Sequence, residues 1–310
     1  MGFIDGLRCI VAKAHKSVAH TWVIRRELFI SFMIKVIPIP TGKAWLKSAQ
    51  KCGGEGRNPF QRKIDIFRDK NWLCLEIFAW LIEHPEGRFI VDTGDSAENS
   101  TPGYLPWWNP FFTKQVSIRV APHEEIGPRL CQMGLDPSKD ISTVILTHYH
   151  HDHTGGLHHF PHTRIVAPRV GWKESRRLKG KMMGCLPQRW PIWFRPELVE
   201  FDGPAVGPFP VSHPITRDGR IFMVPAPGHY VGHSAVVARG EGVTYFFTGD
   251  AGYTLDDMLA DRTDGVTSDP ATSLATIRKI KEFARMEPTI VLPAHDPDGP
   301  QRLRENVIVK

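Results

Sequence analysis

Short apolar runs, separated by turns rich in glycine, proline and aspartate, recur along the chain from residue 34 onwards. Runs of roughly four to eight apolar residues bounded by such turns are typical of buried β-strands. The segment from Pro85 to Gly87 predicts a turn that closes a hairpin. The expected strands are 34–39, 74–82, 88–91, 143–146, 164–167, 197–201, 221–224, 234–238, 244–248 and 289–292.

Apolar residues at helical spacing predict one long helix over residues 270–286. Asp269 is a suitable N-cap for this helix, and Pro270 is suited to its first turn because that position needs no backbone N–H donor. Shorter helices are expected at 124–133 and 171–181. The side chains expected to face the core from the long helix are Leu274, Ile277, Ile280 and Phe283.

Residues 1–33 mix apolar and basic positions in a pattern that permits one or two helices. We interpret them as an N-terminal extension. It is either a dimerisation arm or part of a pocket wall, or else a helix that packs passively on the domain. Beyond it, no repeat of fixed period and no convincing linker divides the chain. The sequence therefore predicts one domain over residues 34–310, and it is compatible with a homodimer.

The composition is that of an ordinary globular protein. The chain has 310 residues, of which 41% are hydrophobic and 23% charged, and it is long enough to bury a substantial core. No apolar run is long enough to span a bilayer, and basic residues interrupt the apolar stretches near the N-terminus. The cysteines are odd in number and widely scattered, which favours a reduced, cytoplasmic setting. They are Cys9, Cys52, Cys74, Cys131 and Cys185.

The formal net charge of +6 is unevenly distributed. Residues 1–70 contain 14 Lys and Arg against 5 Asp and Glu, so the excess positive charge lies in this part of the chain. A basic segment can contact an anionic membrane surface or a nucleic acid, but a solvated basic face is the commoner cause. Because the chain has no recognisable nucleic-acid-binding module, we expect no nucleic-acid partner.

The densest candidate chemistry lies in the loop 147–156, directly after the expected strand 143–146. Imidazole suits zinc, iron or nickel, and a carboxylate among imidazoles adds an anionic ligand that helps to neutralise a second dication. In a tight loop after a strand, alternate side chains can point to one side of the loop while the next pair points to the other, which suits two adjacent metal ions. The loop therefore predicts a metal centre. Its candidate ligands are His148, His150, Asp152 and His153.

Three later motifs each place one candidate ligand at the end of an expected strand. His229 follows Pro227 and Gly228, Asp250 follows Gly249, and His295 follows Pro293 and Ala294. A single Asp or His at a strand end is usually only a satisfied polar residue. The three motifs gain weight because they follow the histidine-rich loop in one chain and in a fixed order.

The loop 147–156 and these later motifs resemble those of the metallo-beta-lactamase superfamily. This resemblance implies a mixed α/β fold, a four-layer αββα sandwich, with two divalent metal ions. Zinc is the expected metal, with iron, cobalt or manganese as alternatives. It also implies His233 as a residue that supports the ligands. By the resemblance, one metal is held by His148, His150 and His229, the other by Asp152, His153 and His295, and Asp250 bridges the two.

Two features resemble the acyl-homoserine lactonase, or quorum-quenching, branch of this superfamily. They are the hairpin at 79–94, which ends in Asp92, and Tyr253, three residues after Asp250. The resemblance implies that Asp92 is a buried carboxylate near the metals and that Tyr253 donates a hydrogen bond to the substrate. The simpler interpretations are a turn-forming aspartate and a tyrosine that only packs.

The function implied is opening of the lactone ring of a small molecule, an N-acyl-homoserine lactone or a related lactone. Hydroxide shared by the two metals would attack the carbonyl carbon, and Asp152 would relay a proton to the leaving oxygen. A phosphotriesterase, or another carboxylic ester or thioester hydrolase, would use the same metal pair. A nuclease and a non-enzymatic metal-binding scaffold are further alternatives.

Two segments rich in aromatic residues and methionine are candidate walls of a substrate pocket. They are 102–112 and 182–194, which have no clean periodicity. Flat tryptophan rings and flexible methionines can enclose an acyl chain, although such clusters also pack in cores. The candidate pocket residues are Trp107, Trp108, Met182, Met183, Trp190 and Trp193.

Overall fold

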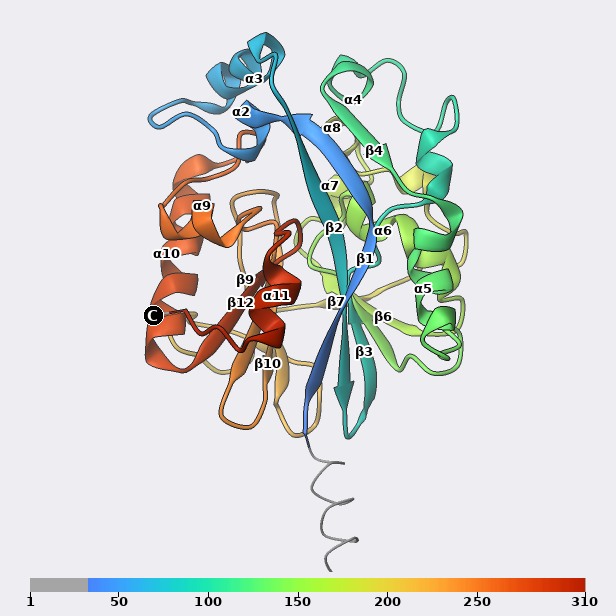
Figure 1. Cartoon of the computed structure of the whole chain (residues 1–310), viewed down its shortest axis with the longest axis vertical. Helices are drawn as coiled ribbons and strands as arrows, with labels where there is room; N and C mark the ends of the chain where they lie inside the picture. Colours follow the sequence, from blue (N-terminus) through green and yellow to red (C-terminus); the bar gives the residue numbers. More distant parts are fainter. Residues whose placement is uncertain (1–32, 310) are drawn as a thin grey trace, which may run out of the picture.

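The computed structural model describes residues 33–309. Two β-sheets pack face to face, and helices cover the outer face of each sheet (Figure 1). This arrangement confirms the expected four-layer αββα sandwich. Apart from Met33, the expected N-terminal extension lies outside the described residues. No helix within residues 33–309 is both long and apolar enough to cross a bilayer.

The larger sheet has seven strands in the order β4-β1-β2-β3-β5-β6-β7. Its strands β4, β1, β2 and β3 pair antiparallel, whereas β3, β5, β6 and β7 pair parallel. The bounds of these strands are β1 (Lys35–Lys47), β2 (Trp72–His84), β3 (Gly87–Val91), β4 (Val116–Arg119), β5 (Thr143–Ile145), β6 (Arg164–Pro168) and β7 (Glu197–Val199).

The smaller sheet has five strands in the order β12-β11-β10-β9-β8. All of its neighbours are antiparallel except β11 and β12, which run parallel. A parallel pair needs a crossover connection, and here helices α9 and α10 supply it. The bounds are β8 (His213–Pro214), β9 (Ile221–Pro225), β10 (Ser234–Arg239), β11 (Thr244–Gly249) and β12 (Thr289–Pro293).

The helices form the two outer layers and one end of the molecule. In Figure 1, α9, α10 and α11 lie beside the smaller sheet, α5 and α6 lie beside the larger one, and α2 and α3 lie at the end. The α-helices are α2 (Ser48–Lys51), α3 (Pro59–Arg68), α4 (Pro110–Lys114), α5 (Ile126–Gln132), α6 (His151–Thr154), α7 (Trp172–Ser175), α8 (Leu178–Met183), α9 (Leu255–Leu259), α10 (Pro270–Met286) and α11 (Gly299–Arg304). The 3-10 helices are η1 (Ala97–Ser100), η2 (Pro122–Glu124), η3 (Gly155–His159) and η4 (Pro187–Arg189).

Three apolar clusters fill the spaces between the four layers. The cluster between the sheets contains Trp80 of β2 and Phe247 of β11, whose rings lie 5.7 Å apart. A second cluster joins the larger sheet to α5, through Ile126 and Leu130. A third joins the smaller sheet to α10. Burying both faces of each sheet is the main stabilising contribution to the sandwich.

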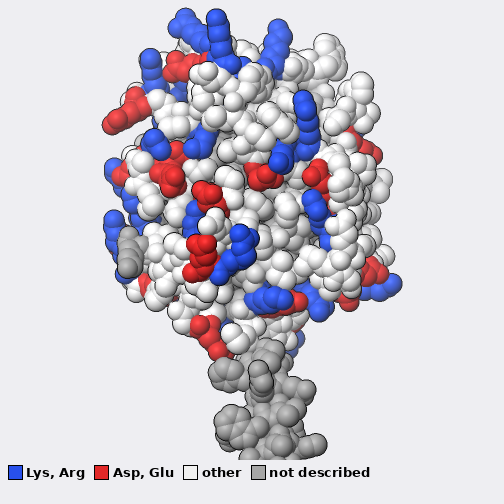
Figure 2. All heavy atoms as spheres, viewed as in Figure 1, with Lys and Arg blue, Asp and Glu red and all other residues white. Residues whose placement is uncertain are grey.

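Charged side chains of both signs are interspersed over the face seen in Figure 2. Basic side chains gather around the end that carries α2 and α3, with acidic side chains among them. Several of the basic groups are paired; the ammonium group of Lys51, for example, lies 2.8 Å from the Asp257 carboxylate. This end contains part of the basic segment seen in the sequence.

The long predicted helix is confirmed as α10, with the predicted N-cap. The Asp269 side chain accepts hydrogen bonds from the backbone N–H and the hydroxyl of Thr272, at 3.1 and 2.7 Å. Ile277, Ile280 and Phe283 are buried, and they pack on the smaller sheet. The fourth residue of the predicted apolar face, Leu274, is only partly buried.

Removing this cap is expected to destabilise the fold without affecting the metal centre. Asp269→Ala deletes the acceptor for the Thr272 N–H, so the free energy of unfolding should fall by about 1 kcal/mol. Asp269→Asn is the matched control, because asparagine is an equally good N-cap. Urea unfolding followed by circular dichroism measures both variants. Equal stability of the alanine variant and the wild type would contradict the role of this cap.

The structure corrects two of the predicted helices. The predicted helix 124–133 is divided, because Glu125 adopts an extended conformation with ψ 153° between η2 and α5. The predicted helix 171–181 becomes the two short helices α7 and α8, because Arg177 is extended with ψ 169°. The apolar periodicity predicted where the helical segments lie. It did not predict the extended residues that interrupt them.

Candidate metal centre

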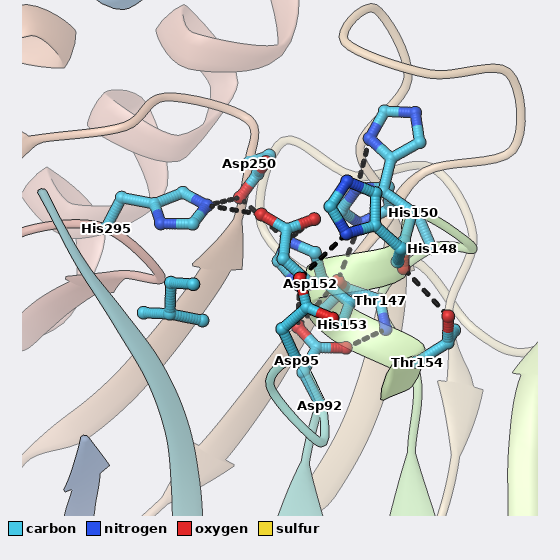
Figure 3. A network of polar contacts seen from close by, with 12 residues as sticks. Asp92, Asp95, Thr147, His148, His150, Asp152, His153, Thr154, Asp250 and His295 are labelled. Carbon is cyan, nitrogen blue, oxygen red and sulfur yellow. Dashed lines mark hydrogen bonds and ion pairs between the residues drawn. The ribbon is translucent and has the colours of Figure 1, made fainter. Parts of the chain in front are cut away.

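The candidate ligands lie together where loops leave both sheets (Figure 3). His148 and His150 follow β5, and Asp152 and His153 belong to the short helix α6. The loops after β9, β11 and β12 add the remaining three, which are His229, Asp250 and His295. Side chains separated by up to 147 positions in the sequence therefore meet at one edge of the sandwich.

The first group consists of three histidines and one oxygen of Asp250. Nδ1 of His150 lies 3.0 Å from Nε2 of His148 and 3.1 Å from Nε2 of His229. Oδ2 of Asp250 lies 3.4 Å from Nε2 of His229. All four side chains are buried, and their ligand atoms converge within 4.8 Å of one another.

The second group consists of Asp152, His153 and His295, next to the other oxygen of Asp250. Oδ1 of Asp250 lies 3.2 Å from Nε2 of His153 and 3.3 Å from Nε2 of His295. Oδ2 of Asp152 lies 3.5 Å from Nε2 of His295. The two oxygens of Asp250 therefore face different groups, which is the geometry required of a bridging carboxylate.

The chemistry of these groups fits two divalent cations. Nε2 of His153 and Oδ1 of Asp250 are buried; although they lie 3.2 Å apart, they are not aligned for a hydrogen bond, and neither has another partner among residues 33–309. In the first group, imidazole nitrogens point at one another, so their lone pairs repel unless a proton or a cation lies between them. Buried polar atoms normally have partners, and a set of histidines and carboxylates is the ligand set of zinc and related metals.

The electrostatics of the site separate its histidines into two kinds. Burial lowers the pKa of His148 and His150 well below the ordinary value, which keeps both imidazoles neutral. Burial also opposes protonation of His153, but the charges of Asp250, Asp92 and Asp152 together outweigh it and raise this pKa well above the ordinary value. Burial opposes ionisation of Asp250, but His295 and His153 hold the pKa of its carboxyl group well below the ordinary value. Asp250 is therefore anionic, as a bridging ligand must be.

Asp92 lies beside the candidate ligands and makes three polar contacts with the loop that carries His148 and His153. Its carboxylate lies 2.8 Å from Nδ1 of His153 and accepts hydrogen bonds from both the backbone N–H and the hydroxyl of Thr147, at 2.8 Å each. Asp92 has a φ of 58°, a conformation that aspartate tolerates better than most residues. It belongs to neither ligand group. This position suits the supporting role that the resemblance implies.

His233 contacts the backbone of Asp250. Its Nδ1 donates a hydrogen bond to the carbonyl oxygen of Ala226 at 2.9 Å, and its Nε2 accepts one from the backbone N–H of Asp250 at 3.0 Å. Burial lowers the pKa of His233 to about 3, so its ring is neutral and can accept. The histidine thus fixes the backbone at Asp250.

Asp264 also supports a ligand, and sequence reasoning missed it. Its Oδ2 lies 3.1 Å from Nδ1 of His229, and its backbone carbonyl accepts a hydrogen bond of 2.7 Å from the buried guanidinium of Arg62. Nδ1 of His295 is held in a similar way, at 2.9 Å from the carbonyl oxygen of Glu76. The only signal for Asp264 was an acidic residue before a glycine, which also occurs at many simple turns.

Replacing Asp264 should weaken metal binding. Asp264→Ala leaves Nδ1 of His229 without its partner, and loss of such partners typically reduces metal affinity about 10- to 100-fold. Asp264→Asn should have a smaller effect because its amide oxygen can still accept the hydrogen bond. Competition with a chromophoric chelator measures the affinity, and circular dichroism checks the fold. Wild-type affinity in the alanine variant would show that Asp264 does not orient His229.

Two glycines allow the ligand loops to approach their neighbours closely. Gly228 has a φ of +133°, and a Cβ atom there would lie 2.3 Å from Cα of Ser273 in α10. Gly249 has a φ of +52°, and a Cβ atom there would lie 2.9 Å from the Thr147 hydroxyl. Any side chain at either position would displace the ligand that follows it, His229 or Asp250.

A small cavity of about 70 Å³ opens onto the candidate metal-ligating groups. Tyr253 lines it and is only 6% exposed, with its ring centroid 5.1 Å from that of His295. Burial, together with nearby carboxylates, raises the pKa of Tyr253 well above the ordinary value, so its phenol keeps its proton. The apolar part of the wall comes from Ala44, Leu46, Phe111, Phe112, Val116, Ile118, Met183 and Val266.

The structure changes the predicted pocket wall. Of its six candidate residues, Met183 lines this cavity. Trp190 instead stacks on Trp172, with ring centroids 5.4 Å apart, in the cluster beside the larger sheet. The other four have exposed side chains and do not line the cavity; they are Trp107, Trp108, Met182 and Trp193. From the aromatic segment, Phe111 and Phe112 line the cavity, because α4 begins at Pro110 and places them there.

Known proteins share both the sequence pattern and the fold. Residues 73–295 match the family model of the metallo-beta-lactamase superfamily. N-acyl homoserine lactonase AttM of Azorhizobium caulinodans is 25% identical over 230 residues, which are 71% of this chain and 81% of that protein. N-acyl homoserine lactonase AiiA of Bacillus thuringiensis subsp. kurstaki is 26% identical over 227 residues, which are 72% and 82% of the two chains.

Solved structures agree with this assignment of the fold. An N-acyl homoserine lactone hydrolase with N-hexanoyl-L-homoserine at its catalytic metal centre has a TM-score of 0.69 and 21% identity, over 87% of this chain and 96% of that one. The dizinc quorum-quenching lactonase AidC has a TM-score of 0.59 and 16% identity, over 86% and 88%. The family model covers well over half of the chain and ends at the last candidate ligand, so this chain belongs to the metallo-beta-lactamase superfamily.

Proposed function

We propose that the protein is a dinuclear metal hydrolase that opens the lactone ring of N-acyl-homoserine lactones or of closely related lactones. The observation that carries this proposal is the convergence of two ligand groups on one cavity, with the phenol of Tyr253 beside them. The named relatives whose sequences match this chain over most of their length, AttM and AiiA, are N-acyl homoserine lactonases.

The residues divide the proposed reaction between them. Two divalent ions held by the ligand groups would lower the pKa of a water molecule and so supply the nucleophile at neutral pH. Tyr253 would donate a hydrogen bond to the substrate carbonyl oxygen as negative charge develops there. Asp152, whose side chain is 16% exposed and lines the cavity, would accept the proton that the attacking water loses and pass it to the ring oxygen as the ester C–O bond breaks. The product is the ring-opened hydroxy acid.

The apolar wall of the cavity supports a substrate with a hydrocarbon part. Leu46 of β1, Phe112 of α4 and Ile118 of β4 come from separate elements and line the same cavity. Such a wall would bury an acyl chain while the polar ring lies at the ligand groups. In the proposed substrate pocket, the residues of this wall, which include Met183, replace the tryptophans predicted from the sequence.

Further properties are part of the proposal. Zinc is the metal we expect, with iron, cobalt or manganese as substitutes, since all accept imidazole and carboxylate ligands. The chain would act as one domain over residues 34–310, in the cytoplasm, on a small molecule and without a nucleic-acid partner. A homodimer is compatible with this role. Four described cysteines are free, as a reducing compartment would keep them.

A pH-stat assay on protein of known metal content tests the proposal. Lactone opening releases acid, so turnover is read directly on N-acyl-homoserine lactones, simple lactones and aryl phosphotriesters. We expect the highest kcat/KM on an acyl-homoserine lactone. Activity should be lost after chelation and should return when zinc is added. Higher kcat/KM on a phosphotriester or an open-chain ester would favour the alternative hydrolases, and no turnover of any substrate by metal-loaded protein would reject the enzymatic role.

A further inference from the structure

A second cluster of possible metal ligands lies outside the catalytic cavity. Glu125 precedes α5, and His158 and His159 end η3. Oε2 of Glu125 lies 3.1 Å from Nε2 of His158 and 2.6 Å from Nε2 of His159, and the two imidazole rings are 4.0 Å apart. None of the three residues lines the catalytic cavity. The cluster therefore needs an explanation of its own.

Hydrogen bonds behind Glu125 orient its carboxylate. Oε1 accepts hydrogen bonds from the backbone N–H of Ala97 at 2.6 Å and from the hydroxyl of Ser96 at 3.2 Å. This leaves Oε2 to face the two histidines. Glu125 is 8% exposed, and its extended backbone is the break that separates η2 from α5. The local chain conformation thus presents this carboxylate to His158 and His159.

The rings of the two histidines are also positioned. Nδ1 of His158 lies 3.1 Å from the carbonyl oxygen of Gly155, an acceptor that places the proton of a neutral ring on Nδ1 and the lone pair on Nε2. A Cβ atom on Gly127 would lie 2.3 Å from Nδ1 of His159, so a glycine is needed there to make room for the ring. A carbonyl partner behind a histidine is the usual support of a metal-ligating imidazole.

A comparable cluster elsewhere shows why this hydrogen bond matters. His84 lies 3.0 Å from the Asp218 carboxylate, and Glu86 completes that group. However, Nδ1 of His84 accepts a hydrogen bond from the backbone N–H of Glu86, so the proton of the neutral ring must be on Nε2. That proton faces Asp218, and no lone pair remains for a cation. The His84 cluster therefore offers no imidazole lone pair to a cation.

We propose that Glu125, His158 and His159 form a third cation site, separate from the catalytic pair and suited to Zn²⁺. Around one Zn²⁺ the ligand atoms would lie about 3.3 Å apart. The observed 2.6 and 3.1 Å therefore require shifts of less than about 1 Å. His158 can move because its side chain is 46% exposed, and water can complete the coordination on that side.

The position of this site suggests what the ion does. His158 and His159 belong to η3, which directly continues α6 and its ligands Asp152 and His153. Glu125 accepts hydrogen bonds from the backbone N–H of Ala97 and the hydroxyl of Ser96, and it leads into α5. An ion held by the three residues would link these segments and stabilise the catalytic loop from outside, without touching substrate.

Zinc titration of the full chain tests the proposal. The Glu125 hydrogen bond raises the pKa of His158, and metal ligands must lose their protons, so the titration is performed at about pH 8. Bound zinc is counted by mass spectrometry after gel filtration. An anomalous difference map of zinc-soaked crystals gives its position. We expect a peak between Glu125 and the two histidines, in addition to those of the catalytic centre.

Glu125→Gln is the most specific variant. Its amide oxygen can keep the hydrogen bonds from Ala97 and Ser96, while its amide group can donate to the histidines, so the fold should persist as the anionic ligand is lost. We expect one fewer zinc per chain, no peak at this cluster and a smaller zinc-induced rise in Tm. His158→Asn combined with His159→Asn should have the same effects.

His123→Asn combined with His162→Asn is the matched control, because both of these histidines are exposed and belong to no described ligand group.

The outcomes separate this proposal from the proposed function. Equal zinc content in the wild type and Glu125→Gln, or a map without a peak at the cluster, would overturn the third site and show that the carboxylate only pairs with the histidines. Either result leaves the catalytic centre untouched. Conversely, loss of one zinc in Glu125→Gln would support the third site even if no lactone were turned over.

Discussion

Replacing Asp250 by asparagine is expected to reduce kcat/KM on the lactone by about a thousandfold, which corresponds to about 4 kcal/mol of transition-state stabilisation. The two carboxylate oxygens of Asp250 face the two ligand groups, within 3.4 Å of His229 on one side and of His153 and His295 on the other. An amide is neutral and offers only one oxygen, so one group loses its shared anion. The pH-stat assay gives kcat/KM, and metal analysis of the same sample gives zinc per chain.

Asp202→Asn is the matched control for this substitution, because the Asp202 side chain is 81% exposed and outside the centre. It should retain wild-type turnover and metal content. The Asp250 variant should also bind at least one metal more weakly. If Asp250→Asn instead kept both the full metal content and full turnover, the bridging role of Asp250 would have to be abandoned.

Tyr253→Phe is expected to lower kcat about 100- to 1000-fold and to change KM little. Removing one hydrogen-bond donor from a developing oxyanion has an effect of this size. The phenylalanine keeps the packing of the buried ring against His295 and removes only the hydroxyl. Because Tyr253 belongs to neither ligand group, zinc content should remain at the wild-type level. Steady-state kinetics on the best lactone, with metal analysis, tests all three expectations.

Tyr245→Phe is a suitable control for this experiment. Tyr245 lies on β11, packs against the cluster between the sheets and does not line the catalytic cavity, so its variant should turn over normally. An unchanged kcat in Tyr253→Phe would show that the tyrosine only packs. A loss of zinc would show instead that it acts on the metal centre.

The sequence predicted the strands of this fold well because burial leaves a local pattern. Each buried strand, such as β9 or β12, is a short apolar run that ends at a proline or glycine turn. Helix α10 was predicted for the same reason, because its N-cap and its apolar face are both defined by residues close together in the sequence. The short β4 and α3 were missed, since α3 presents few apolar residues and β4 has only four. Pairing with β1, a partner 70 or more residues away, defines β4.

The candidate ligands could also be predicted from short sequence motifs, whereas the residues that support them could not. His148, His150, Asp152 and His153 lie within six positions, and the later ligands each follow a strand and a tight turn. By contrast, Asp264 approaches His229 from 35 positions away. No spacing rule connects an acidic residue to a partner that the fold brings from another segment.

The pocket wall shows the same limit within a single segment. The aromatic run contains both Trp107 and Phe112, and composition alone does not rank them. The start of α4 at Pro110 buries Phe112 in the cavity and leaves Trp107 81% exposed. Orientation of a side chain depends on the backbone path, which depends on what the segment packs against.

The sequence by itself determined most of the strands and the long helix, because periodic burial is a property of neighbouring residues. Through its resemblance to a known superfamily, the sequence also implied the fold class and the candidate metal ligands. Only the tertiary structure decided which residues hold the ligands in place, which side chains line the cavity and that Glu125 meets His158 and His159. These depend on contacts between segments far apart in the chain, and such contacts exist only once the two sheets have packed together.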